Sequence, residues 1–221
     1  MSTGRAEAFS DGVFAIAITL LVLSLRLSGN GTVTSQLLAA WPQYFAYVVS
    51  FLTIGIMWMN HHTILAHVQR VDRPLLVLNL LLLMGIVVIP FPTVLVADNL
   101  THDGGTAAVV TYGLVMIAIS FGFAGLWIYV ATHATALGAA VPPEALRKSI
   151  PGFTGGLIAY VLATLIARFF SPLAALIIFG LLAVYYLFDH LPSPAGAAAA
   201  GQQGVPGGPA GPGAGDGGTG A

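Results

Sequence analysis

Apolar residues fill most of this chain in six long stretches, which short polar or proline-containing segments separate. A stretch of about 17–25 apolar residues is long enough for a helix to cross the hydrocarbon core of a bilayer. The pattern therefore predicts an all-α integral membrane protein with six transmembrane helices. We expect these helices at residues 9–25, 41–65, 75–97, 107–132, 150–167 and 173–188.

Glycine and proline mark where the predicted helices end or bend. Gly29, Asn30 and Gly31 terminate the first helix. Pro90 and Pro92 predict a kink or an early end in the third helix, because proline cannot donate the helical hydrogen bond. Residues 142–148 contain two prolines and three charges and are expected to form a loop.

The composition supports a lipid environment. Charged residues make up 7% of the 221 residues, against about 25% in soluble domains. So few charges cannot cover the surface of a soluble protein, whereas lipid can surround an apolar one. The net charge of −1 gives no basic footprint for nucleic acid, and the chain has no cysteine for disulfides or thiolate metal sites.

Basic residues predict the orientation of the six helices. With six spans both termini lie on one side, and five basic residues fall on that side against two on the other. The positive-inside rule then places both termini in the cytoplasm of a cell-membrane protein. The larger group is Arg5, Arg70, Arg73, Arg147 and Lys148, and the smaller group is Arg26 and Arg168.

The last thirty residues differ from the rest. Residues 192–221 are mainly Gly, Ala and Pro and contain almost no large apolar side chain, so we expect a disordered cytoplasmic tail. Residues 1–191 form the predicted six-helix domain. Its two halves show no convincing internal repeat, which weighs against an inverted-repeat transporter.

Polar side chains near the membrane suggest a structural network. Asp11 lies near the start of the first predicted helix, where Ser10 or Asp11 could simply cap it. Trp58, His61 and His62 near the end of the second helix fall at a similar depth. We hypothesise that Arg5, Ser10 and Asp11 bond with Trp58 and with His61 or His62, and so lock the two helices together.

Other interpretations of the polar residues are weaker. His61 and His62 are adjacent and point about 100° apart on a helix, so they cannot both face one metal ion. The chain lacks a G-x-S-x-G motif, so a serine hydrolase is disfavoured, and we expect neither a cofactor nor an enzymatic activity. Asn79 in the third helix is expected to bond between helices.

A motif at the first helix resembles a known channel family. Arg5, Phe9, Ser10 and Asp11 match R-x-x-x-F-S-D, and the match continues to Leu23. This sequence resembles the transmembrane protein 175 family, which comprises endolysosomal potassium channels and their prokaryotic relatives. Residues 58–62 also resemble the second helix of that family.

The resemblance implies a homotetramer with a central pore lined by four copies of the first helix. It implies a potassium channel without a T-V-G-Y-G filter. The family's constriction residue corresponds to Ile16 and its pore threonine to Thr19, and further apolar pore positions fall on Leu20 and Leu23.

The spacing of these four residues agrees with that assignment. Positions i, i+3, i+4 and i+7 share one helix face, although the same stripe would also suit ordinary helix–helix packing. A ring of isoleucines can expel water, and threonine oxygens can replace part of an ion's hydration shell. Because no charged ring is present, we expect modest selectivity for potassium over sodium.

Two further classes of function stay open at this point. A secondary transporter or proton-coupled carrier would need ionisable groups at mid-membrane, and the predicted helices have none there. A membrane-embedded enzyme would need a nucleophile or metal constellation, and none is recognisable.

Overall fold

The computed structural model describes residues 3–27, 31–139 and 150–188 as an all-helical protein. The predicted loop at residues 142–148 and the predicted disordered tail at residues 192–221 lie outside this part. The elements in chain order are α1 Thr3–Leu20, the short 3-10 helix η1 Leu21–Ser24, α2 Val33–Ala39, α3 Trp41–Ala66, α4 Arg73–Val88, α5 Pro90–Asn99, α6 Gly105–Thr132, α8 Ile150–Phe169 and α9 Pro172–Phe188.

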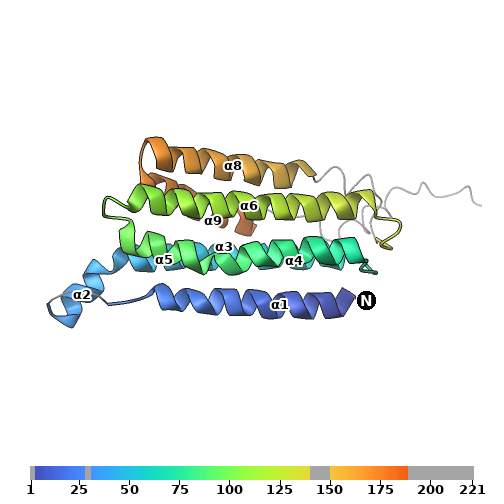
Figure 1. Ribbon diagram of the computed structural model, residues 1–221, viewed down its shortest axis with the longest axis horizontal. Helices are drawn as coiled ribbons and strands as arrows, with labels where there is room; N and C mark the ends of the chain where they lie inside the picture. Colours follow the sequence, from blue (N-terminus) through green and yellow to red (C-terminus); the bar gives the residue numbers. More distant parts are fainter. Residues whose placement is uncertain (1–2, 28–30, 140–149, 189–221) are drawn as a thin grey trace, which may run out of the picture.

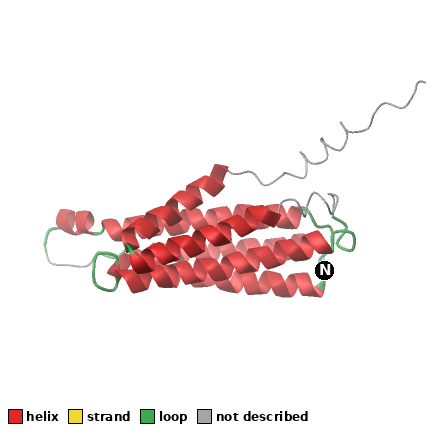
Figure 2. Ribbon diagram, turned by 90° about the horizontal axis from the view of Figure 1, so that it is seen from above, coloured by secondary structure: helices red, strands yellow, loops and turns green. Residues whose placement is uncertain are grey.

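The long helices form a bundle with their axes roughly parallel (Figures 1 and 2). α1 lies at one edge and packs on α3 and α4, while α6 packs on α4 and α8. The start of α1, the turn from α3 to α4 and the end of α6 share one end of the bundle. α2, the α5–α6 turn and the α8–α9 turn lie at the other end.

A proline break divides the third predicted helix into α4 and α5. Pro90 has no N–H to donate to the carbonyl of Ile86, so α4 ends there. The N–H of Ile89 bonds to the Ile86 carbonyl instead, at 3.1 Å. α5 continues nearly in line with α4 (Figure 1), and together they form one apolar stretch, Arg73–Asn99.

Three buried hydroxyl groups join the helices next to this break. Ser50 Oγ lies 2.8 Å from Thr93 Oγ1 and 3.2 Å from the Tyr112 hydroxyl oxygen. The Thr93 hydroxyl also donates to the carbonyl of Ile89, at 2.8 Å. Buried hydroxyls without partners are costly, so this cluster holds α3, α5 and α6 in one arrangement.

The outer surface is suited to lipid. Large apolar side chains are exposed on several helices, as on α4, where Leu80, Leu81 and Met84 are about half exposed or more. Four helical stretches in the described residues are long and apolar enough to cross a membrane. They are Thr3–Ser24, Trp41–Ala66, Arg73–Asn99 and Gly105–Thr132, and α8 and α9 add the shorter apolar stretches Gly155–Phe169 and Pro172–Tyr186.

The structure corrects two expectations about the first predicted helix and its connection. α1 begins at Thr3, so Ser10 and Asp11 lie inside it and neither caps it; the capping interpretation is wrong because the helix starts seven residues before Ser10. The short helix α2 was not expected. Its N-cap, Thr32, accepts a hydrogen bond from the Ser35 N–H at 3.3 Å, which is the usual role of a threonine at that position.

Asp72 links two helices at the end of the bundle that holds the N-terminus. Its Oδ1 accepts from the N–H of Leu75 and so caps α4, while its Oδ2 accepts from the Tyr129 hydroxyl of α6 at 2.6 Å. Burial alone would raise the pKa of Asp72. The bonds from Tyr129 and Leu75 outweigh that effect and hold this pKa below its ordinary value of 3.8.

Replacing Tyr129 with Phe removes one bond to this carboxylate and should lower the stability of the purified protein by about 1 kcal/mol at neutral pH. Because the folded pKa of Asp72 lies below the unfolded one, this contribution is complete above the unfolded pKa. It is lost as the pH falls through the folded value. Thermal unfolding at pH 7 and in acid measures both effects.

Tyr185→Phe is the matched control, since the Tyr185 hydroxyl has no hydrogen bond within the described residues. Equal melting temperatures for Tyr129→Phe and Tyr185→Phe at pH 7 would contradict the assignment.

Candidate functional site

One face of α1 and the following η1 carries the four residues predicted to line a pore. Ile16, Leu20 and Leu23 are 59%, 39% and 58% exposed, and Thr19 is exposed between them. We call these four residues the α1 stripe. The opposite face of α1 is buried against the bundle at Ala6, Ser10, Phe14 and Ala17. The stripe is therefore not part of the subunit's own core.

The helix tightens at the end of the stripe. Residues 21–24 form the 3-10 helix η1, in which Ser24 is buried and donates its hydroxyl hydrogen to the Leu21 carbonyl at 2.7 Å. A 3-10 helix has three residues per turn, so Leu20 and Leu23 lie almost directly above one another. Both leucines thus stay on the exposed side where an α-helix would have rotated them slightly apart.

The Thr19 hydroxyl is already committed as a donor. Its Oγ1 donates to the carbonyl of Ile16 at 2.9 Å. The lone pairs of this oxygen consequently remain available on the exposed face.

A buried chain of hydrogen bonds fixes the other face of α1. The Ser10 hydroxyl donates to the Ala6 carbonyl at 2.9 Å and accepts from Asn79 Nδ2 at 2.9 Å. Asn79 Oδ1 in turn lies 2.7 Å from His61 Nε2, which places the ring hydrogen on Nε2. Ser10, Asn79 and His61 are all buried and come from α1, α4 and α3.

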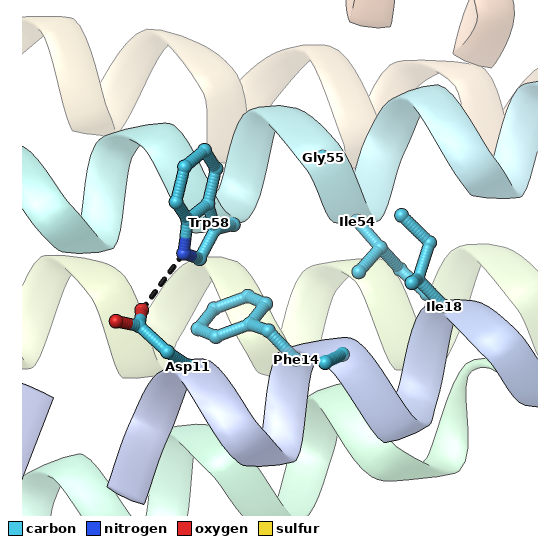
Figure 3. Close-up of a pocket in the computed structure, with 7 residues that line it drawn as sticks. Asp11, Phe14, Ile18, Ile54, Gly55 and Trp58 are labelled. Carbon is cyan, nitrogen blue, oxygen red and sulfur yellow. Dashed lines mark hydrogen bonds between the residues drawn. The ribbon is translucent and has the colours of Figure 1, made fainter. Parts of the chain in front are cut away.

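A second pair of contacts joins α1 to α3 nearer the surface. Trp58 donates its indole N–H to Asp11 Oδ1 at 2.8 Å (Figure 3), and His62 Nδ1 lies 2.6 Å from Glu7 Oε1. The rings of Trp58 and His62 stack with their centroids 6.2 Å apart. Glu7 and Asp11 are four residues apart on α1, and Trp58 and His62 are four residues apart on α3. The two contacts therefore lie about one helical turn apart along the interface between these helices.

The predicted network is therefore present in a different form. Ser10 pairs with His61 through Asn79, while Asp11 pairs with Trp58, so the two sets are separate. Arg5 is exposed and takes no part in either, since it has no hydrogen bond or ion pair within the described residues; its place in the predicted network is corrected.

Sequence reasoning missed one member and left another undecided. Glu7, the partner of His62, was missed, although its spacing of four residues from Asp11 matches the spacing of Trp58 and His62. Asn79 was expected to bond between helices but without a named partner. Phe9 of the motif is 55% exposed and has no role in the buried chain.

A shallow pocket lies between α1 and α3 beside the Asp11–Trp58 bond (Figure 3). Its volume is about 320 Å³, and it is lined by Asp11, Phe14, Ala15, Ile18, Ile54, Gly55 and Trp58. Apart from the Asp11 carboxylate and the Trp58 indole N–H, the side chains that line the pocket are apolar and offer no reactive or hydrogen-bonding group. No three His, Asp or Glu side chains in the described ranges come together to hold a metal ion.

Comparisons with known proteins identify relatives of this chain. A family model described as endosomal/lysosomal potassium channel TMEM175 matches residues 5–90, which contain the stripe and both sets of contacts. A potassium channel of Streptomyces collinus is 45% identical over 202 residues, covering 90% of this chain and 98% of the relative. A potassium channel of Chamaesiphon minutus is 46% identical over 135 residues, covering 59% of this chain and 66% of the relative.

A solved structure shares the fold as well. The crystal structure of a lysosomal potassium-selective channel TMEM175 homolog from Chamaesiphon minutus superimposes with a TM-score of 0.75 at 37% identity. The match covers 84% of this chain and 96% of that one. All of these relatives are named as ion channels, not enzymes.

The buried hydrogen-bond network of Ser10, Asn79 and His61 predicts that removing the Asn79 side chain lowers the stability of the protein. Asn79→Ala leaves Ser10 and His61 without a shared partner and should destabilise the protein by about 2 kcal/mol, the usual penalty for breaking a buried polar network. Thermal unfolding of the purified protein measures it. Asn60→Ala on α3 is the control, because that half-buried side chain makes no hydrogen bond to the described residues; equal melting of the two variants would contradict a stabilising role.

Proposed function

This chain belongs to the TMEM175 family, and from that membership we propose that it is a potassium-permeable cation channel of the cell membrane. The observation that carries the proposal is the α1 stripe, which is exposed in the subunit while the rest of α1 is anchored to α3 and α4. A helix fixed on one side and presenting a regular row of side chains on the other is suited to line a path shared between subunits. The relatives that cover almost the whole chain are named as potassium channels.

We propose that four copies assemble with α1 around the central axis. Each of Ile16, Thr19, Leu20 and Leu23 then becomes a ring of four. In this assembly α1 with η1, α3, α4 with α5, α6, α8 and α9 are the six membrane-spanning units. α8 and α9 lie farther along the chain, on the side of the bundle away from α1 (Figure 1). The partners are further copies of the chain, the surrounding lipid and the permeating ions, and the proposal needs no cofactor.

The chemistry of the rings supports passive conduction with modest selectivity. A ring of Ile16 side chains forms an apolar constriction that controls passage by expelling water. The Thr19 ring offers oxygen lone pairs that replace part of a hydration shell, because each hydroxyl hydrogen is bound to the Ile16 carbonyl. Without a ring of carboxylates at the constriction, the preference for potassium over sodium rests on this weak coordination.

The distribution of charge supports cytoplasmic termini. Arg5 near the start of α1, Arg70 in the turn before α4 and Arg73 at the start of α4 belong to the end of the bundle where the chain begins. Arg26, which follows η1, and Arg168 in the last turn of α8 belong to the opposite end. The positive-inside rule assigns the first end to the cytoplasm.

Ion flux into liposomes that contain the purified protein tests the function. We expect potassium to move passively down its gradient, faster than sodium, whereas a coupled carrier would saturate and depend on a second ion. Ile16→Ser should raise the flux by roughly fivefold, because removing a barrier of about 1 kcal/mol at a dry constriction changes a rate by that factor.

Protein-free liposomes are the baseline, and Ile128→Ser is the matched control, since Ile128 is an exposed isoleucine of α6 away from the stripe. No potassium flux in the parent would reject the channel. Parent-like flux in Ile16→Ser would remove Ile16 from the path.

Thr19→Val tests whether the proposed ring of Thr19 side chains contributes to selectivity, because the substitution removes the hydroxyl and hardly changes the size of the side chain. Loss of the four oxygens should lower the permeability ratio of potassium to sodium by about threefold, which corresponds to an interaction of about 0.7 kcal/mol. Reversal potentials under opposing potassium and sodium gradients measure the ratio. Thr111→Val, at an exposed threonine of α6, is the control, and an unshifted reversal potential in Thr19→Val would reject the role of Thr19.

A further inference from the structure

Arg5 is a charged motif residue that takes no part in the described contacts between α1 and the bundle. It is exposed, and within the described part of the chain its guanidinium group has no hydrogen bond or carboxylate partner. The two acids on α1 are already engaged, Glu7 with His62 and Asp11 with Trp58. Within the described part of the subunit, the positive charge at this end of α1 is therefore not paired with a carboxylate.

Helix geometry places Arg5 on the same face as the α1 stripe. Arg5 precedes Ile16 by eleven residues, which is three full turns plus about 20° at 100° per residue, and lies about 16 Å from it along the axis. Phe9 and Gly12, which continue the same line between them, are also exposed. A Cβ added at Gly12 would have no atom within 4 Å, so this part of the face is open.

The acids point elsewhere on the helix. Glu7 and Asp11 are turned toward α3, where their carboxylates meet His62 and Trp58. Among the described residues Arg5 is thus the charged side chain on the line that runs from the start of α1 to Leu23. Cation-conducting pores usually carry rings of Asp or Glu at their entrances, and a ring of arginines has the opposite effect on a cation.

We propose that four Arg5 side chains form a cationic ring at the N-terminal mouth of the pore and limit the rate at which cations enter from that side. The inference rests on the proposed function, because the ring exists only if α1 lines a shared axis. Arg5 then acts on the ion through space and not by contact, so its effect depends on charge and on ionic strength.

The expected size of the effect follows from Coulomb's law. Four charges about 10 Å from the axis in water oppose an entering cation, and salt screens them with a Debye length of about 10 Å at 0.1 M and 3 Å at 1 M. Neutralising the ring should therefore raise entry by about threefold at 0.1 M salt and by about sevenfold at 0.01 M. At 1 M the difference should almost vanish.

The test is a recording of potassium current across oriented membranes, with KCl on the N-terminal side varied from 0.01 to 1 M. Arg5→Gln should raise the current entering from that side by these factors. Arg5→Lys should behave like the parent because it keeps the charge. Arg70→Gln, which removes the same charge from the loop after α3 at the same end, is the matched control and should change little.

The parent protein supplies a measurement that needs no variant. Its current from the N-terminal side should rise more steeply than in proportion to KCl, because salt both supplies ions and screens the ring. A proportional rise, or an Arg5→Gln profile that superimposes on the parent, would overturn the ring. A parent that passes no potassium at any salt concentration would instead reject the proposed channel.

Discussion

The rotation of α1 about its own axis is the constraint on which the rest of this structure depends. Ser10 and Asn79 are buried and each needs a partner, and the chain that runs from the Ala6 carbonyl through both of them to His61 satisfies them together. Turning α1 by one residue would move Ser10 about 100° away and leave the Asn79 side-chain N–H without its acceptor in an apolar interior. The contacts of Glu7 and Asp11 with α3 reinforce the same rotation. Which side chains of α1 face outward is therefore decided by polar groups on its inner face.

These polar contacts on one side of α1 explain how an almost entirely apolar helix acquires two distinct faces. Nearly every residue from Val13 to Leu23 is apolar, so hydrophobicity alone gives the helix no preferred orientation. Small side chains at Ala6 and Ala17 let α1 lie close to its neighbours, and the larger Phe14 packs 5.4 Å from the ring of His61. The bulky residues Ile16, Leu20 and Leu23 are left exposed on the far side of the helix.

Polar groups are used in the same way elsewhere in the bundle. Pro90 ends α4 within an otherwise continuous apolar stretch, and the hydroxyls of Ser50, Thr93 and Tyr112 gather beside the break. Asp72 caps α4 and receives the hydroxyl of Tyr129 at the end of the bundle. In each case a few hydrogen bonds select one packing among many that hydrophobic contact would tolerate, because lipid offers no alternative partner to a polar group.

The sequence by itself determined the membrane class, the helical fold, the family and most of the helix positions. These depend on local quantities: the length of apolar stretches, the places of proline and glycine, and the spacing of R-x-x-x-F-S-D. It also placed Ile16, Thr19, Leu20 and Leu23 on one face, since helix periodicity is fixed. Only the tertiary structure decided that this face is exposed, that Asn79 joins Ser10 to His61, that Glu7 meets His62 and that Arg5 stands apart. The physical reason is that the sequence of an apolar helix does not by itself determine which face is buried. Ser10 and Asn79 are 69 residues apart, so their pairing is decided by how three helices pack and not by the order of residues along one helix.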